Sequence, residues 1–218
     1  MVFLNSIIIT GSSRGIGAAI AKQWCKRNKN NLYYAISKYN DFDVTNFKQF
    51  EKCIKDFYDF ESDYYLPYAL INNAGVAEQG NILEIDIDSI DRQFNVNFKA
   101  VVNCTQQYAK FCIKKKIKGK IINICSTAGL GARPGRSIYA ASKAALINFS
   151  LSMSEELKPY GIKVYCICPS AVNTDMRRFL EPDDNFENML QPEEVGTFVC
   201  DLIENGKYLD NHILEVKK

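Results

Sequence analysis

The chain has 218 residues, of which 47% are hydrophobic and 24% charged, and its formal net charge at pH 7 is +2. This length suits one well-buried core, and the composition is ordinary for a globular protein. The small net charge favours no polyanionic partner, and no uncharged apolar run approaches the roughly 18 residues of a membrane-spanning helix. We therefore expect one cytoplasmic domain over residues 1–218, with no nucleic-acid or membrane partner.

Short apolar runs alternate with longer amphipathic segments along the whole chain. The apolar runs are at residues 2–9, 31–36, 68–72, 119–125, 162–168 and 211–216, and helical patterns cover about 15–28, 45–60, 88–115, 138–158 and 191–205. Such alternation is typical of βαβ units around a parallel sheet with helices on both faces. No linker, repeat or low-complexity tract interrupts the pattern, which predicts a single α/β domain.

The first apolar run leads directly into "TGSSRGIGAAIAKQW", with Gly11, Gly15 and Gly17 between an expected strand and an expected helix. Glycines permit a tight turn and let backbone N–H groups approach a pyrophosphate, whose charge the helix N-terminus favours. The spacing is G-x3-G-x-G, not the G-x-G-x-x-G of many dinucleotide folds. We interpret the stretch as a nucleotide phosphate loop rather than as a turn without a ligand.

The second strand, "NLYYAI", is followed by Ser37 and Lys38. In dinucleotide folds an acid about 20 residues past the loop binds the adenosine ribose 2′-hydroxyl, but no acid stands here. A hydroxyl and an ammonium suit a 2′-phosphate better, and Arg14 adds a second positive charge. We therefore expect NADP(H) as the preferred cofactor. NAD(H) is the alternative, because a later strand end would bring Asp41 to the ribose.

A tyrosine and a lysine stand four residues apart in "SIYAASKAAL", as Tyr139 and Lys143. The spacing says little by itself, since Tyr34 and Lys38 share it. Tyr34 and Lys38, however, lie on or just past a strand, where four residues span about 13 Å, whereas Tyr139 and Lys143 share one face of a helix. An unperturbed tyrosine has a pKa of about 10, and a cation nearby favours the phenolate. The helical pair therefore has the chemistry of a proton-transfer pair.

Eight cysteines and one histidine limit the remaining chemistry. The cysteines are scattered, and the only close pair, Cys166 and Cys168, has the spacing of neither a CxxC redox motif nor a zinc site. We expect buried free thiols and no metal site. His212 has no partner in the sequence, which excludes a histidine-based catalytic triad.

Seven motifs extend these observations along the chain. They are "TGSSRGIG" at 10–17, "DVT" at 43–45, "NNAG" at 72–75, "NVNF" at 95–98, "ICS" at 124–126, "YAASK" at 139–143 and "PSAVNTDM" at 169–176. In order and spacing they resemble the short-chain dehydrogenase/reductases, and among these the compact 3-oxoacyl-(acyl-carrier-protein) reductases and carbonyl reductases. The resemblance implies a Rossmann-type doubly wound parallel sheet of about seven strands. It also implies an NAD(P)-dependent oxidoreductase that interconverts a carbonyl and an alcohol by hydride transfer.

The resemblance assigns roles to particular residues. The catalytic tetrad would be Asn97, Ser126, Tyr139 and Lys143, with Tyr139 as general acid/base, and Asn95 competes with Asn97 for its place. The cofactor-binding residues would be Gly11, Ser13, Arg14, Gly15, Ile16, Gly17, Ser37, Lys38, Asp43, Val44, Asn73, Ala74, Gly75, Tyr139, Lys143, Val172 and Thr174. Of these, Asp43 and Val44 would contact the adenine, and Val172 and Thr174 the nicotinamide carboxamide. Asn72 would tie adjacent strands together.

Two departures from the family pattern bear on the site. Between "YYAIS" and "DFDV" there are too few residues for the helix that commonly links the second and third strands. The segment from Arg177 to Leu190, which is the substrate lid in the family, is short and acidic in its middle. We expect a more open adenine pocket and a small or open substrate site.

The resemblance implies a small-molecule carbonyl or alcohol substrate and a homodimer or homotetramer. A catalytically silent dinucleotide sensor or scaffold on the same fold is the alternative function. Such proteins typically lose the tyrosine or the lysine, and this chain keeps both. An epimerase or dehydratase of the extended relatives is disfavoured, because those need a larger C-terminal substrate domain.

Overall fold

The computed structural model describes residues 6–58, 66–206 and 213–218. The outermost parts of three expected elements, and His212, lie outside these residues. The described strands form one parallel sheet in the order β2-β1-β3-β4-β5-β6. They are β1 (Ser6–Thr10), β2 (Leu32–Ile36), β3 (Pro67–Asn72), β4 (Lys120–Ile124), β5 (Lys163–Pro169) and β6 (Ile213–Val216).

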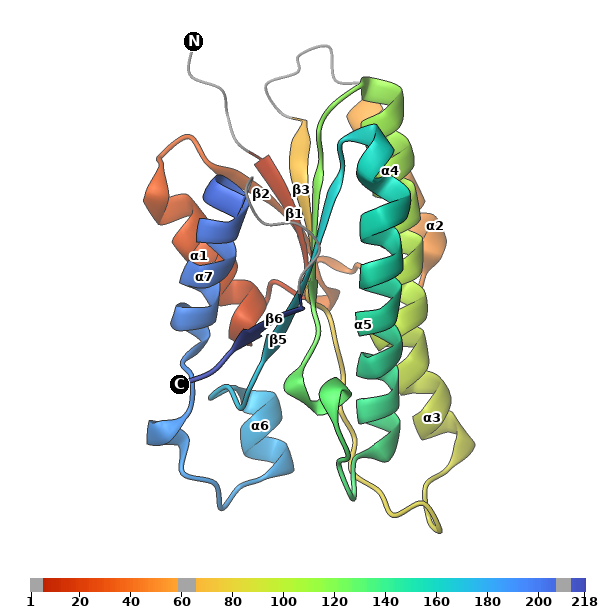
Figure 1. Ribbon diagram of the computed structural model, residues 1–218, viewed down its shortest axis with the longest axis vertical. Coiled ribbons are helices and arrows are strands. Elements are labelled where there is room, and N and C mark those ends of the chain that lie inside the picture. The colour runs from red at the N-terminus through yellow and green to blue at the C-terminus, as the bar shows by residue number, and fades with distance from the viewer. Residues whose placement is uncertain (1–5, 59–65, 207–212) are drawn as a thin grey trace.

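Helices cover both faces of the sheet (Figure 1). One face carries α1 (Gly15–Arg27) and α7 (Pro192–Asn205), and the other carries α2 (Phe47–Tyr58), α4 (Ala100–Lys115) and α5 (Ser137–Leu157). Two shorter helices, α3 (Ile87–Phe94) and α6 (Asp175–Leu180), lie near the carboxyl ends of the strands. This is the doubly wound α/β architecture that the alternation of apolar runs and amphipathic segments predicted.

The alternation of side chains along β1 divides the core into two layers. All five residues of this strand are buried. Ile7 and Ile9 pack in the cluster under α1 and α7, whereas Ile8 packs in the cluster under α2 and α4. Successive side chains of a strand point to opposite faces, so a strand covered by helices on both sides must be apolar throughout. The run "IIIT" meets this requirement.

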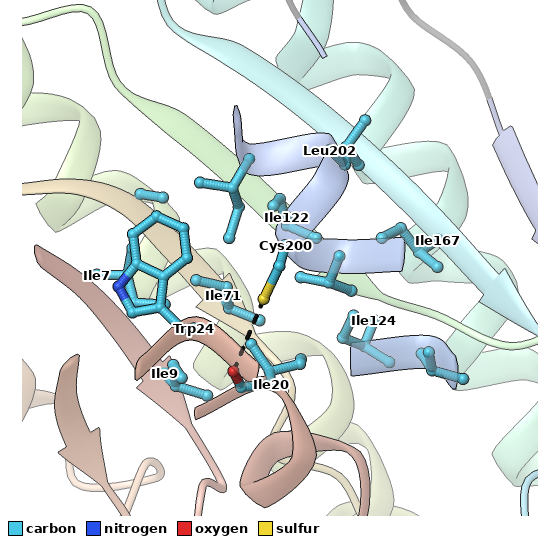
Figure 2. Packing of buried hydrophobic residues seen from close by; sticks show 14 of the residues in the cluster. Ile7, Ile9, Ile20, Trp24, Ile71, Ile122, Ile124, Ile167, Cys200 and Leu202 are labelled. Atoms are coloured by element: carbon cyan, nitrogen blue, oxygen red, sulfur yellow. Dashed lines mark hydrogen bonds between the residues drawn. The ribbon is translucent and has the colours of Figure 1, made fainter. Parts of the chain in front are cut away.

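Trp24 fills the layer between α1 and the sheet (Figure 2). Its side chain is fully buried, and its indole N–H donates to the Leu32 carbonyl at 3.0 Å. Helix α7 packs against α1 through Cys200, whose Sγ lies 3.8 Å from the Ile20 carbonyl oxygen of α1. These contacts hold α1, and the glycine loop before it, firmly against the sheet.

The described residues form a sheet of six strands where the resemblance implied about seven. After β2 the chain makes one 3₁₀ turn, η1 (Lys38–Asn40), and continues through residues 41–46 into α2. That connection is too short for a further helix and strand, in agreement with the short interval between "YYAIS" and "DFDV". The expected number of strands was therefore one too high.

Because all the strands are parallel, their carboxyl ends meet at one edge of the sheet, the lower end in Figure 1. In doubly wound sheets ligands bind at this edge. None of the described helices is both long and apolar enough to span a membrane.

Candidate active site

A pocket of about 470 Å³ opens at the carboxyl edge of the sheet. Most of the residues predicted to bind the cofactor line it, together with two members of the tetrad. They are Gly11, Ser13, Arg14, Gly15, Ile16, Ser37, Lys38, Asp43, Val44, Asn73, Ala74, Gly75, Tyr139, Lys143 and Thr174. These residues come from six separate stretches of the chain, which the parallel sheet brings to one place.

The glycine loop has the backbone that its sequence requires. Gly11 and Gly15 have φ angles of +67° and +56°, a region that residues with a Cβ rarely adopt. A Cβ on Gly11 would also lie 2.8 Å from the Ala74 Cα. Gly17 does not line the pocket. It allows close packing beneath the loop, since its Cβ would lie 2.3 Å from the Gly11 carbonyl oxygen.

The N-terminus of α1 follows this loop directly and carries no side-chain cap. Its N-cap residue, Arg14, makes no side-chain capping hydrogen bond, and no acid stands in the first turn. The first N–H groups of a helix have no partner within the helix and carry partial positive charge. Gly15, at the first position of the helix, lines the pocket. The end of α1 is therefore suited to an anion in the pocket.

Asn73 and Thr10 hold the loop in place. The Asn73 side-chain amide donates to the carbonyls of Thr10 and Gly11 at 3.0 and 2.9 Å. The Thr10 hydroxyl oxygen accepts from the backbone N–H groups of Asn73 and Ala74 at 2.9 and 3.0 Å. Asn72 lies one residue earlier and donates to the Asn123 side chain at 2.8 Å, so it joins β3 to β4 as expected.

The end of the pocket beyond β2 combines a buried hydroxyl with exposed charges. Ser37 is buried, whereas the Lys38 side chain is 84% exposed, and its Nζ lies 3.8 Å from an Asp43 carboxylate oxygen. Hydrogen bonds from the Thr45 backbone and hydroxyl, more than Lys38, lower the pKa of Asp43. Asp41 is the C-cap of η1 and is not among the residues that line the pocket.

Tyr139 and Lys143 stand on the first turns of α5 at the opposite end. Tyr139 is half-buried, and the Lys143 Nζ lies 5.9 Å from the centre of its ring. Lys143 is only 4% exposed, and its ammonium donates to the Ile124 carbonyl at 2.9 Å. Among the described residues Lys143 forms no salt bridge. The pocket wall therefore holds a buried cation beside a phenol.

Ser126 follows β4 and begins a 3₁₀ turn, η4 (Thr127–Leu130). Its hydroxyl oxygen accepts from the Ala128 N–H at 3.1 Å. The hydroxyl hydrogen donates to no acceptor in the described part of the chain. Ser126 is not among the pocket-lining residues, although its neighbour Cys125 is.

Asn97 is fully buried in a π-helical turn, η3 (Asn95–Lys99), between α3 and α4. Its amide donates to the Val76 carbonyl at 2.8 Å and to the Ser142 hydroxyl at 3.0 Å, and its carbonyl oxygen accepts from the Val76 N–H at 2.9 Å. A Cβ on Gly75 would lie 3.3 Å from this oxygen and 3.6 Å from the Lys143 Nζ. Asn97 thus links the segment after β3 to α5, behind the pocket wall.

Val172 is the remaining predicted residue outside the pocket. It is buried in the cluster under α1 and α7 and pairs with Leu190 in a short parallel bridge. Thr174, two residues later, does line the pocket. Its hydroxyl oxygen accepts from the Arg177 N–H at 3.3 Å, which caps α6.

The pocket also includes residues that the sequence reasoning missed. They are Ile36, Phe42, Val76, Val96, Ile124, Cys125, Asp175 and Met176. Five of them lie inside the quoted motifs, namely Val96, Ile124, Cys125, Asp175 and Met176. The other three, Ile36, Phe42 and Val76, each adjoin a predicted residue, so extending the motifs by one residue would have found them.

A sequence model of the short chain dehydrogenases matches residues 39–185. The chain belongs to this family. It is 28% identical over 239 residues to the 3-oxoacyl-(acyl-carrier-protein) reductase FabG of Chlamydia trachomatis, covering 97% of this chain and 95% of the relative.

Two solved structures show the same fold as this short chain dehydrogenase. A 4-hydroxyisoleucine dehydrogenase complexed with NADH is 25% identical, with a TM-score of 0.81 and coverage of 97% of this chain and 96% of that one. A gluconate 5-dehydrogenase from Burkholderia cenocepacia in complex with NADP and tartrate is 25% identical, with a TM-score of 0.84 and coverage of 99% and 94%. These findings confirm the fold class, and they show an NAD(P)-dependent oxidoreductase that interconverts a carbonyl and an alcohol.

Proposed function

We propose that this short chain dehydrogenase uses NADP(H) to interconvert a carbonyl and an alcohol on a small-molecule or acyl substrate, with Tyr139 as general acid/base. One observation carries the proposal: the glycine loop and the Tyr139–Lys143 pair face the same pocket of about 470 Å³. Binding of a dinucleotide needs the glycine loop, and proton transfer to a carbonyl oxygen needs the Tyr139–Lys143 pair.

The pocket has the features that a dinucleotide requires. The uncapped N-terminus of α1 and the left-handed glycines Gly11 and Gly15 suit a pyrophosphate. Ser37 and Lys38, which follow β2, line the pocket and Asp41 does not, and Arg14 of the glycine loop is a further cation in the pocket lining. A hydroxyl and cations favour a 2′-phosphate over a bare ribose. This arrangement supports NADP(H) over NAD(H).

The other end of the pocket suits acid/base catalysis. When bound, the nicotinamide supplies or accepts the hydride. A carbonyl oxygen that gains negative charge needs a proton donor, and the phenol of Tyr139, which lines the pocket, would supply it. The ammonium of Lys143 is buried, has no carboxylate partner among the described residues and lies 5.9 Å from the centre of the Tyr139 ring. It would stabilise negative charge that develops beside it during proton transfer. The Ser126 hydroxyl, with its hydrogen free, would donate to the same substrate oxygen.

Replacement of Tyr139 by phenylalanine tests the proposal, because it removes the hydroxyl and keeps the ring. Tyr139→Phe is expected to lose turnover by about 10²–10⁴-fold, the usual contribution of general acid–base catalysis, while NADPH binding is retained. Turnover would be measured as NADPH oxidation over a panel of ketones and aldehydes, and binding by nucleotide fluorescence.

Tyr160→Phe is the matched control, since Tyr160 is 55% exposed on η5 (Lys158–Tyr160), at the far end of α5. Near-normal turnover in Tyr139→Phe would refute its role as general acid/base. Absence of turnover in the wild type over the whole panel, with NADPH bound, would instead favour a dinucleotide sensor on this fold.

We further propose that residues 1–218 form one domain that assembles as a homodimer or homotetramer, without a nucleic-acid or membrane partner. The shared sheet of the described strands supports the single domain. Light scattering on the purified chain tests the assembly, and a monomeric mass at micromolar concentration would contradict it.

A further inference from the structure

Three buried cysteines meet beside the carboxyl ends of β4 and β5. Cys125 follows β4, and Cys166 and Cys168 are alternate residues of β5, so their side chains share one face. The Cys166 Sγ lies 3.3 Å from the Cys125 Sγ and 3.8 Å from the Cys168 Sγ, and all three sulfurs lie within 4.8 Å of one another. All three are free thiols. They are called the thiol cluster below.

We propose that the thiol cluster is a binding site for one soft monovalent metal ion, Cu(I), with a thiolate ligand from each cysteine. Metal–thiolate bonds of about 2.3 Å place the three sulfurs of a trigonal site about 4 Å apart. The sulfurs of the cluster already lie close to this separation, so an ion would need only small side-chain movements.

The surroundings favour Cu(I) over Zn²⁺. Structural zinc is almost always held by four ligands, and in the described part of the chain no fourth cysteine, carboxylate or imidazole joins the three sulfurs. The neighbours of the cluster are apolar, with Val101, Leu146 and Ile147 packed around it. Soft thiolate ligands select Cu(I).

One cation offsets part of the negative charge of the thiolates. The Lys143 ammonium donates to the carbonyl of Ile124, the residue before Cys125, and attracts negative charge on the Cys125 sulfur. Each S–H that becomes a ligand exchanges its proton for the metal and releases it to solvent, without a change of oxidation state.

The thiol cluster connects to the pocket through one residue. Cys125 lines the pocket and directly precedes Ser126. An ion would therefore enter through the pocket, and a nucleotide bound there would cover its path. Movement of Cys125 toward an ion would also shift Ser126. The proposal stands on the sulfur geometry and does not depend on the proposed function.

Titration of the purified, reduced chain with Cu(I) under anaerobic conditions, against a chromophoric Cu(I) chelator, tests the site. We expect one tightly bound ion per chain and, by X-ray absorption, three sulfur neighbours at about 2.3 Å. Cys166→Ala and Cys168→Ala are expected to weaken binding by at least about 100-fold, since even changes outside the ligand set cost 10–100-fold. Saturation with NADP⁺ is expected to slow uptake.

Cys112→Ala is the control, because Cys112 is a buried thiol on α4 outside the cluster. Circular dichroism and thermal melting check that each variant is folded. Equal loss of affinity in the Cys112 variant would overturn the proposal. So would fewer than three sulfur neighbours in the wild type, a result that does not depend on any variant folding.

Discussion

Gly17 leaves no room for a side chain where α1 meets the glycine loop. Its Cβ would lie 2.3 Å from the Gly11 carbonyl oxygen and 2.4 Å from the Asn73 amide nitrogen. Gly17→Ala must therefore move backbone, and it is expected to lower the free energy of unfolding by about 1–3 kcal/mol, the usual cost of overpacking. Denaturant unfolding measures the change.

Gly131→Ala is the control for this prediction. A Cβ there would meet only the Arg133 guanidinium, at 3.9 Å, and the φ angle of −170° suits any residue. We expect a change within about 0.5 kcal/mol, as for most surface substitutions. Equal stability of both variants would show that the loop adapts to a side chain at Gly17.

Lys38 determines the cofactor preference in our proposal. Lys38→Ala is expected to lower kcat/KM with NADPH by about 10- to 100-fold, the range for losing a hydrogen bond to a charged group, and to leave the value with NADH nearly unchanged. Steady-state kinetics with both nucleotides measure the ratio. Lys29→Ala, another exposed lysine, is the control, and equal losses with both nucleotides would contradict the proposal.

Among the larger elements, the π-helical turn η3 joins three parts of the site. It turns Asn97 inward, where the side chain satisfies both backbone groups of Val76 and contacts Ser142. The Ser142 hydroxyl donates in turn to the Tyr139 carbonyl at 2.7 Å. Such π-helical turns inside α-helices are frequent at functional sites. This connection fixes the start of α5 relative to the end of β3.

An ion pair joins the segment after β3 to α3. The Arg92 guanidinium makes two 2.8 Å hydrogen bonds to Glu78, which, with a smaller contribution from Ser89, lower the Glu78 pKa from 4.5 to about 2. The folded state therefore binds this proton less readily than the unfolded chain. The contribution to stability is complete above about pH 4.5 and is lost as the pH falls toward 2.

Arg92→Gln tests this pH dependence. The difference in unfolding free energy between wild type and variant is expected to be largest above pH 4.5 and to shrink as Glu78 becomes protonated. Denaturant unfolding between pH 3 and 7 measures the difference. The Lys55→Gln variant, which breaks an exposed i,i+4 pair with Glu51, is the control, and we expect a smaller effect from it. A wild-type advantage that does not change with pH would exclude the ion pair as its source.

For the whole molecule, the pocket couples cofactor binding to stability. Residues from α1, β2, β4, α5 and the segment after β5 all line it, so a nucleotide that binds only the folded chain stabilises the entire fold. NADPH at 100 times its dissociation constant is expected to add about 2.7 kcal/mol to the unfolding free energy. Thermal and chemical unfolding with and without NADPH measure the shift.

The Tyr139→Phe variant sharpens this prediction, because it is expected to lose turnover and to keep the full stabilisation by NADPH. A variant that loses both would place Tyr139 in cofactor binding rather than in proton transfer. Stabilisation by NADH equal to that by NADPH would count against the preference for NADP(H).

Local patterns were sufficient to predict much of this protein. Continuous apolar runs specify buried strands, a glycine-rich turn between strand and helix predicts an anion site, and Tyr139 and Lys143 share a face because a helix repeats every 3.6 residues. These signals lie within a few residues of one another, so they can be read before the chain is folded. The order of the motifs then indicated the family and the doubly wound sheet.

Strand order and register decided the rest, because they bring together residues far apart in the chain. The short path from β2 to α2 leaves six strands, and the pairing of Val172 with Leu190 draws Val172 into the core. Asn97 hydrogen-bonds to Ser142, which lies 45 residues away in the sequence, and Cys125 contacts Cys166, which lies 41 residues away. Local periodicity does not predict such long-range contacts, because they depend on which strands are neighbours in the sheet and on the register of their pairing.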